Sequence, residues 1–81
     1  MEGRYAFHVW FDGCAVFDRL SGDSHVLDVF AAMLFLSALK ASAEVIEGLR
    51  PPEISPETLA SAFADARLRL EKLRLPYPRP S

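Results

Sequence analysis

Hydrophobic and polar positions alternate with a period of two in the first part of the chain, which is typical of β-strands. Residues 4–11 and 14–20 both follow this alternation, and an Asp-Gly pair at 12–13 separates them. Such a pair favours a two-residue hairpin with a type I′ turn. On the first strand, Tyr5 lies on a uniformly apolar face, which we expect to meet helices, and Trp10 lies on the other.

A short polar segment, Ser-Gly-Asp-Ser at 21–24, follows the hairpin. Gly22 can adopt a positive φ at little cost, and the Ser and Asp side chains can bond nearby backbone amides, so this segment predicts a turn. Residues 25–28 then form a short third strand that runs directly into a helix.

Three helices are predicted after the strands. Residues 29–39 are apolar around nearly the whole circumference, which identifies the central core helix, with Asp28 as its N-cap. Ser42 caps a short helix at 43–47 that ends at Gly48. The third helix covers 57–74 and has apolar residues at spacings of three and four.

The third helix begins after Ser55 as N-cap and Pro56 at the first helical position. Phe63 on its apolar stripe is expected in the core together with Phe30 and Leu34. The Pro-rich residues 76–81 cannot continue a helix, and we interpret them as a flexible tail.

This order of elements predicts an α+β fold. A three-stranded antiparallel sheet followed by three helices is winged-helix-like, and residues 1–75 form a single domain. The composition is that of a globular protein, with 51% hydrophobic and 25% charged residues.

Charge and cysteine content refine this interpretation. Residues 67–81 hold five basic side chains and one acidic, although the whole chain has a net charge of −2. Cations near the end of a helix complement its dipole, which accounts for most of this cluster. A single cysteine, no secretory signal and no apolar run of about 18 residues predict a cytoplasmic protein without a membrane span.

No enzymatic arrangement emerges from the sequence. Ser24 and His25 are adjacent in an extended stretch, so their side chains project to opposite faces and cannot form a nucleophile–base pair. His8, His25 and Cys14 lack the local spacing of a metal site. We therefore expect no catalytic residues, no metal and no cofactor.

Recognition of a peptide is the remaining function class. A short third strand with a free edge can accept an added strand, and a neighbouring helix can supply a groove wall. Here the edge is His25, Val26 and Leu27, and the predicted wall on the third helix is Ala60, Ala64, Arg67, Leu68 and Glu71.

The stretch Ser-Gly-Asp-Ser-His-Val-Leu at 21–27, between a hairpin and an Ala-rich helix, resembles the PqqD-like peptide chaperones. It is most similar to the branch associated with a kinase related to HPr kinase, in which Thr and Leu are usual at positions 24 and 26. The resemblance covers roughly residues 7–75. It implies a winged-helix module that holds the leader of a ribosomally made precursor peptide against its third strand and third helix. Such a module presents the leader to a modifying enzyme or kinase-related partner.

Two other interpretations stay open. The chain can be a structural subunit that forms a homodimer through an exposed strand edge. A winged helix can also bind DNA through its third helix, but the negative net charge and an exposed track of alanine and leucine disfavour nucleic acid.

Overall fold

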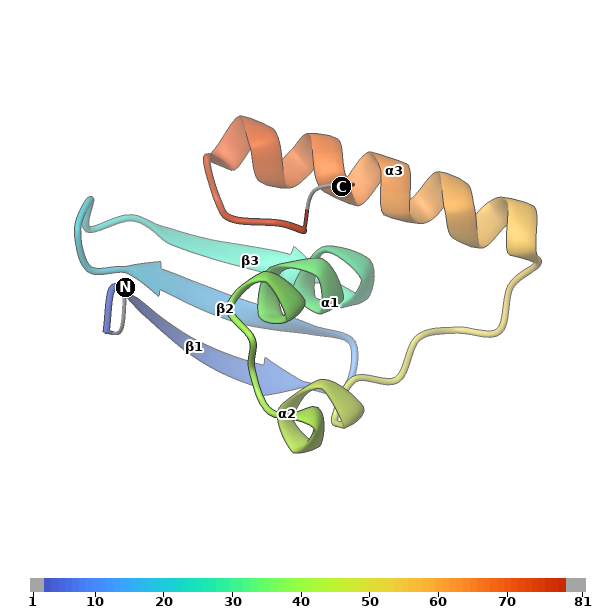
Figure 1. Cartoon of the computed structure of the whole chain (residues 1–81), viewed down its shortest axis with the longest axis horizontal. Coiled ribbons are helices and arrows are strands. Elements are labelled where there is room, and N and C mark those ends of the chain that lie inside the picture. The colour runs from blue at the N-terminus through green and yellow to red at the C-terminus, as the bar shows by residue number, and fades with distance from the viewer. Residues whose placement is uncertain (1–2, 79–81) are drawn as a thin grey trace.

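The computed structural model describes residues 3–78 of the chain. Within these residues, three strands are followed by three helices (Figure 1). The elements are β1 (Tyr5–Trp10), β2 (Gly13–Asp18), β3 (Ser24–Asp28), α1 (Val29–Ala38), α2 (Ala43–Glu47) and α3 (Pro56–Leu73). This confirms the predicted α+β class with a three-stranded antiparallel sheet followed by helices.

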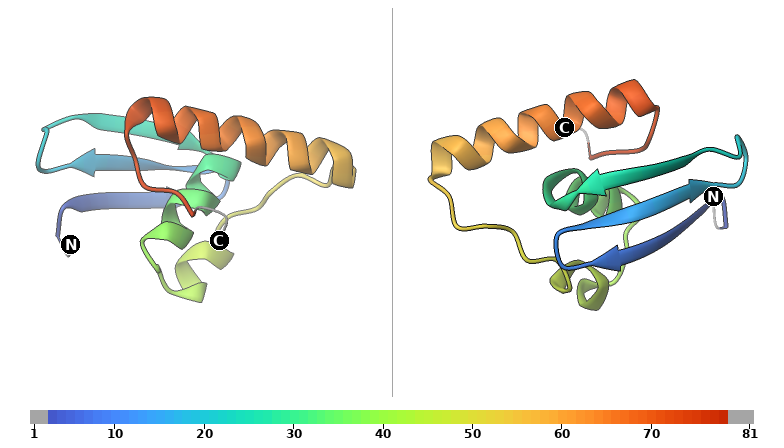
Figure 2. Two further views of the ribbon diagram at one scale, coloured as in Figure 1. Left: turned by 45° about the horizontal axis from the view of Figure 1, so that its top comes forward. Right: turned by 180° about the vertical axis from the view of Figure 1, so that it is seen from behind.

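The strands form one antiparallel sheet in the order β1-β2-β3, so β1 and β3 are its two edges. The register pairs Phe7 with Val16 and Val16 with His25, and these side chains point to the face that the helices cover. Ala15 pairs with His8 and Val26 on the other face. Seen from behind, no helix formed by the described residues covers that second face (Figure 2). The sheet is therefore half-covered, as its alternating pattern indicated.

The β1–β2 turn differs from the prediction. Trp10 pairs with Gly13, so the two loop residues are Phe11 and Asp12, and neither has a positive φ. The type I′ turn at 12–13 was therefore wrong. Gly13 is required for a different reason, because a Cβ there would overlap the carbonyl oxygen of Leu27 on β3.

The core lies between the sheet and α1, as expected for a helix that is apolar all round. Phe35 is fully buried, and Tyr5 and Phe7 from β1 pack edge-on against its ring at centroid distances of 5.4 and 6.5 Å. Ala66 and Leu70 of α3 belong to the same core.

Phe30, Leu34 and Phe63 are only half-buried, which corrects their assignment to the core. Phe30 and Phe63 pack against each other with ring centroids 5.4 Å apart. The N-terminal half of α3 extends beyond the sheet (Figure 1).

Side-chain caps fix the helix starts. Asp28, Ser42 and Ser55 accept hydrogen bonds from the amides of Ala31, Val45 and Thr58, and all three caps were predicted from sequence. At the other end of α3, Arg74 adopts a left-handed conformation and Leu75 returns to the core.

The segment after α3 packs against the body of the protein. Leu75, the last residue of the predicted domain, is buried. Tyr77 packs against the core, so this part of the predicted 76–81 tail does not behave as a flexible tail. Residues 79–81 of that predicted tail, and residues 1 and 2, lie outside the described part of the chain.

One ion pair closes the end of the sheet that lies opposite the β1–β2 turn. The guanidinium of Arg4 contacts both carboxylate oxygens of Asp18 at 3.3 Å, and the amide of Leu20 donates to the same carboxylate at 2.9 Å. Asp18 is only 5% exposed. These hydrogen bonds, chiefly that from Arg4, hold the pKa of Asp18 below its ordinary value.

We predict that Gly13→Ala lowers the free energy of unfolding by about 1–3 kcal/mol, because the new methyl group must displace the Leu27 backbone. Gly22→Ala is the matched control. Gly22 has a φ of 79° and open space around it. Gly22→Ala should therefore cost only about 1 kcal/mol, the cost of holding an alanine in a left-handed conformation. Urea denaturation measures both. Equal losses in the two variants would show that the contact with Leu27 is unimportant.

We predict that Phe35→Ala costs about 3–5 kcal/mol and prevents stable folding, since the ring is fully buried between β1 and α1. Phe63→Ala should cost clearly less, because that side chain is half-exposed. Thermal melts followed by circular dichroism compare the two. A larger loss at Phe63 would mean that α3 is packed more tightly than described.

Because the pKa of Asp18 is lowered in the folded protein, the free energy of unfolding depends on pH in the acid range. A carboxyl whose pKa is lower in the folded state stabilises the protein above its unfolded pKa of about 4, and this contribution is lost as the pH falls through the folded value. Asp18→Asn should therefore be less stable at neutral pH and lose less stability between about pH 5 and pH 2. Denaturant midpoints across this range test it, and parallel curves for variant and wild type would contradict it.

Candidate functional site

The outer edge of β3 presents backbone groups that no strand of residues 3–78 pairs with. The Asp18 amide donates to the Asp23 carbonyl at 2.8 Å, which fixes the phase of the β2–β3 ladder. With that phase, the backbone groups of residues 25 and 27 point to β2, and those of Ser24 and Val26 point outward. Among the described residues, no strand pairs with this edge. Two residues thus offer their N–H and C=O groups to an added strand.

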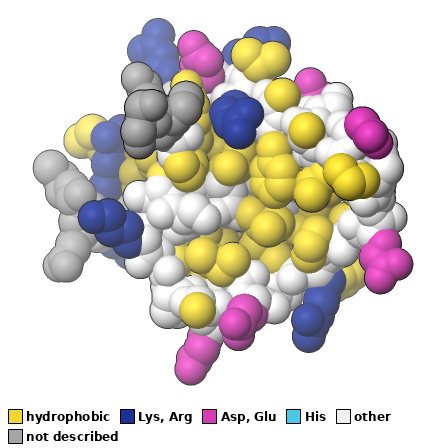
Figure 3. Space-filling model, turned by 45° about the vertical axis from the view of Figure 1, so that its right-hand side comes forward, with side chains coloured by type: hydrophobic (Ala, Val, Ile, Leu, Met, Phe, Trp, Pro, Cys, Tyr) yellow, Lys and Arg dark blue, Asp and Glu magenta, His cyan; other side chains and the backbone are white. Residues whose placement is uncertain are grey.

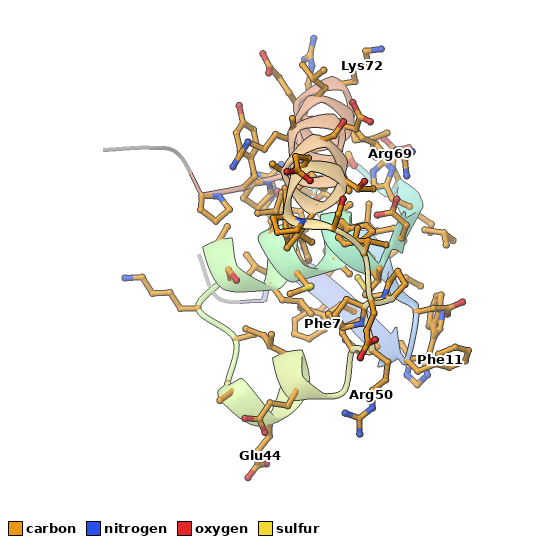
Figure 4. All side chains as sticks on the ribbon, turned by 90° about the vertical axis from the view of Figure 1, so that its right-hand side faces the viewer. Phe7, Phe11, Glu44, Arg50, Arg69 and Lys72 are labelled. Atoms are coloured by element: carbon orange, nitrogen blue, oxygen red, sulfur yellow. The ribbon has the colours of Figure 1, made fainter. Side chains whose placement is uncertain are left out.

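Helix α3 runs beside this edge. Arg69 Nη1 lies 3.0 Å from Asp28 Oδ2 at the end of β3, and each side chain is about half exposed. In the end-on view, Arg69 projects toward the β3 side of α3, while the segment after α3 runs along its opposite side (Figure 4). The side of α3 that faces β3 is therefore the one that bears Arg69.

The three predicted strand residues occupy three different environments. His25 is half-buried and Leu27 is buried, both on the helix-covered face of the sheet. The Val26 side chain is 72% exposed on the opposite face. Only the backbone of Val26 belongs to the edge, so its side chain cannot line a groove between β3 and α3.

The five residues predicted on the third helix are exposed but do not face β3. They lie between about 100° and 180° around the helix axis from Arg69. They are Ala60, Ala64, Arg67, Leu68 and Glu71. Glu71 instead borders a hollow with Tyr5 and Tyr77, on the side where the chain returns after α3. The structure therefore does not bring these five residues together with β3.

Sequence reasoning missed Arg69. A helix that packs on a core by one stripe has a flank on each side of that stripe, and periodicity does not say which flank meets a given strand. Arg69 lies on one flank and Arg67 on the other. One signal could have identified the flank that faces the third strand. Asp28 ends that strand, so a basic residue of the third helix that pairs with Asp28 would mark the facing flank.

The described residues include no cluster of three or more His, Cys, Asp or Glu side chains suited to holding a metal ion. Ser24 and His25 lie on opposite faces of the sheet. Burial raises the pKa of the Cys14 thiol to about 11, so this side chain stays protonated in the core at neutral pH. No helix in the described part of the chain is both long and apolar enough to cross a membrane.

Two apolar surfaces remain open. On the uncovered face of the sheet, Phe17 lines a shallow hollow floored by Ala6 and Ala15, and Val26 lies beside Ala15 in the register. On the helical side, hydrophobic side chains gather in the middle of the face shown in Figure 3. Half-buried Phe30, Met33 and Leu34 recur on α1 at spacings of three and four, so α1 keeps an apolar stripe that the chain itself covers only in part.

Comparisons with protein-family models, with curated proteins and with solved structures found no match to this chain.

Proposed function

We propose that this protein is a non-catalytic peptide-binding module of the cytoplasm. It holds the leader of a ribosomally made precursor peptide as an added strand on β3, beside α3, and presents it to a modifying enzyme. The observation that carries the proposal is the free outer edge of β3, where Ser24 and Val26 direct their backbone groups away from the sheet.

Strand addition suits an edge of this kind. Main-chain hydrogen bonds supply affinity without requiring a particular sequence, and side chains next to the edge supply selectivity. A long uncovered edge is otherwise a risk for aggregation, and proteins usually keep such edges short or cover them. β3 has only five residues, and α3 lies over one side of it, which leaves a site for one short extended segment.

The ion pair at the end of the site is better suited to selecting a peptide than to stabilising the fold. Arg69 and Asp28 are both about half exposed, and an exposed pair contributes little to folding, typically 0–1 kcal/mol. A bound leader can therefore exchange this pairing for contacts of its own at small cost. An acidic side chain on the leader would compete for Arg69, and a basic one for Asp28.

The resemblance at residues 21–27 supports the same assignment. Gly22 has a φ of 79° in the turn that leads into β3, and the Asp23 carbonyl accepts the hydrogen bond that fixes the ladder phase. The Ser-Gly-Asp segment thus decides which backbone groups of β3 point outward. On α3, the peptide site that we propose contains Arg69 in place of the five residues that the sequence analysis predicted.

We predict that Val26→Pro weakens binding of a leader peptide at least tenfold. Proline removes the outward N–H of Val26 and leaves the β2–β3 ladder intact, because that N–H does not face β2. Val26→Ser is the matched control. It changes the side chain on the other face and keeps the N–H, so it should bind as the wild type does. The probe is a labelled synthetic leader from a short reading frame beside this gene, titrated by fluorescence anisotropy.

Circular dichroism and light scattering accompany the titration. Leu68→Asp on the far flank of α3 should leave both folding and leader affinity unchanged. Equal affinity in Val26→Pro and Val26→Ser would remove β3 as the site. A concentration-dependent dimer that Val26→Pro dissociates, with no leader binding, would favour the homodimer interpretation instead.

A further inference from the structure

The opposite edge of the sheet, β1, also has backbone groups that point away from β2. The Arg19 amide donates to the Arg4 carbonyl at 2.8 Å, so alternate β1 residues from Arg4 onward bond to β2. The backbone groups of Tyr5, Phe7 and Val9 therefore point away from the sheet. No strand in the described part of the chain pairs with them.

Helix α2 forms a wall beside this second edge. A hollow of about 370 Å³ lies between them, lined by Phe7, His8 and Val9 of β1 and by Glu44, Val45 and Gly48 from the α2 region. Phe7 is 39% exposed although its side chain points to the helix-covered face. Figure 4 shows Phe7 between the sheet and α2, with Glu44 at the outer side of α2.

The groove has one closed end. The Arg50 amide, just after α2, donates to the Phe11 carbonyl at 2.6 Å and ties the chain across the end of β1. No residue of α2 itself is buried, so the helix is held mainly by its neighbours, of which Leu49 is buried. A short extended segment can enter from the Tyr5 end and run along β1 until it meets this crossing.

One carboxylate, that of Glu44, is among the residues that line the hollow. Glu44 is exposed, and within residues 3–78 the ion pairs are Arg4 with Asp18 and Arg69 with Asp28, so Glu44 has no cationic partner there. A carboxylate beside an apolar hollow and a row of free amides is complementary to an extended peptide with one basic side chain.

We propose that the groove between β1 and α2 is a second binding site, for an extended polypeptide segment that adds to β1 and places a lysine or arginine at Glu44. Apolar side chains of the segment fill the hollow over Phe7, Val9 and Val45. This site is independent of the β3 edge, because the two edges lie on opposite sides of β2.

A synthetic probe tests the proposal on the whole chain. The probe is a labelled hexapeptide of alternating valine and threonine with one central lysine, compared with a peptide that has glutamate in place of lysine. The lysine peptide should bind at least tenfold more tightly, with a difference that shrinks as salt rises. Glu44→Lys should invert this preference, whereas Glu53→Lys, an exposed control in the segment before α3, should retain it.

Two further measurements locate the probe. Amide chemical shifts should change at Phe7, Val9 and Val45 and stay constant at Ser24 and Val26. N-methylation of alternate probe amides should abolish binding in one register and spare it in the other, since only one set of amides faces the strand. Val26→Pro should leave probe affinity unchanged.

The opposite results overturn the proposal. The site does not exist if the peptide fails to bind up to about 1 mM, or if amide chemical shifts change only at Ser24 and Val26. The role of Glu44 is wrong if the protein shows no preference for the lysine peptide, or if Glu44→Lys does not alter that preference. Loss of probe binding in Val26→Pro would assign the peptide to β3 and remove the second site. The leader titration is scored separately, so either site can fail without the other.

Discussion

The direct junction between β3 and α1 is the constraint on which the rest of the structure depends. Asp28 is the last residue of β3 and the N-cap of α1, and its Oδ1 accepts the Ala31 amide at 2.8 Å. With no linker between strand and helix, α1 must fold back at once over one face of the sheet. Its buried residues then meet Cys14, Val16 and Leu27 on that face.

The positions of the other two helices depend on α1. Helix α3 packs on α1 through Ala66 and Leu70, and the other oxygen of Asp28 binds Arg69, which turns one flank of α3 toward β3. The short helix α2 follows α1 and stands beside β1. One layer of helices thus covers one face of the sheet, with a helix next to each edge strand.

This arrangement explains why both candidate sites are edges. A three-stranded sheet has two edge strands and only one central strand, and a small chain has few residues to cover them. Here the edges are short and each lies below a helix, so an incoming strand finds backbone partners on one side and a wall on the other. The β3 wall carries a paired cation at Arg69, and the β1 wall carries the carboxylate of Glu44, which has no ion-pair partner among residues 3–78. The two edges therefore differ in the charge that they offer.

The sequence by itself determined the features that depend on local chemistry. Caps at Asp28, Ser42 and Ser55, the proline that opens α3 and the positive φ of Gly22 each arise from residues close together in the chain, and their order was enough for the α+β class. Tertiary structure decided the rest, because those features depend on contacts between distant segments. The register of β1 against β2 placed the hairpin turn at Phe11 and Asp12. The packing of α3 left Phe63 half-buried, and the pairing of Asp28 with Arg69 oriented one flank of α3 toward β3. Periodicity identifies the buried stripe of a helix, but only the packed neighbours decide what each flank beside that stripe will face.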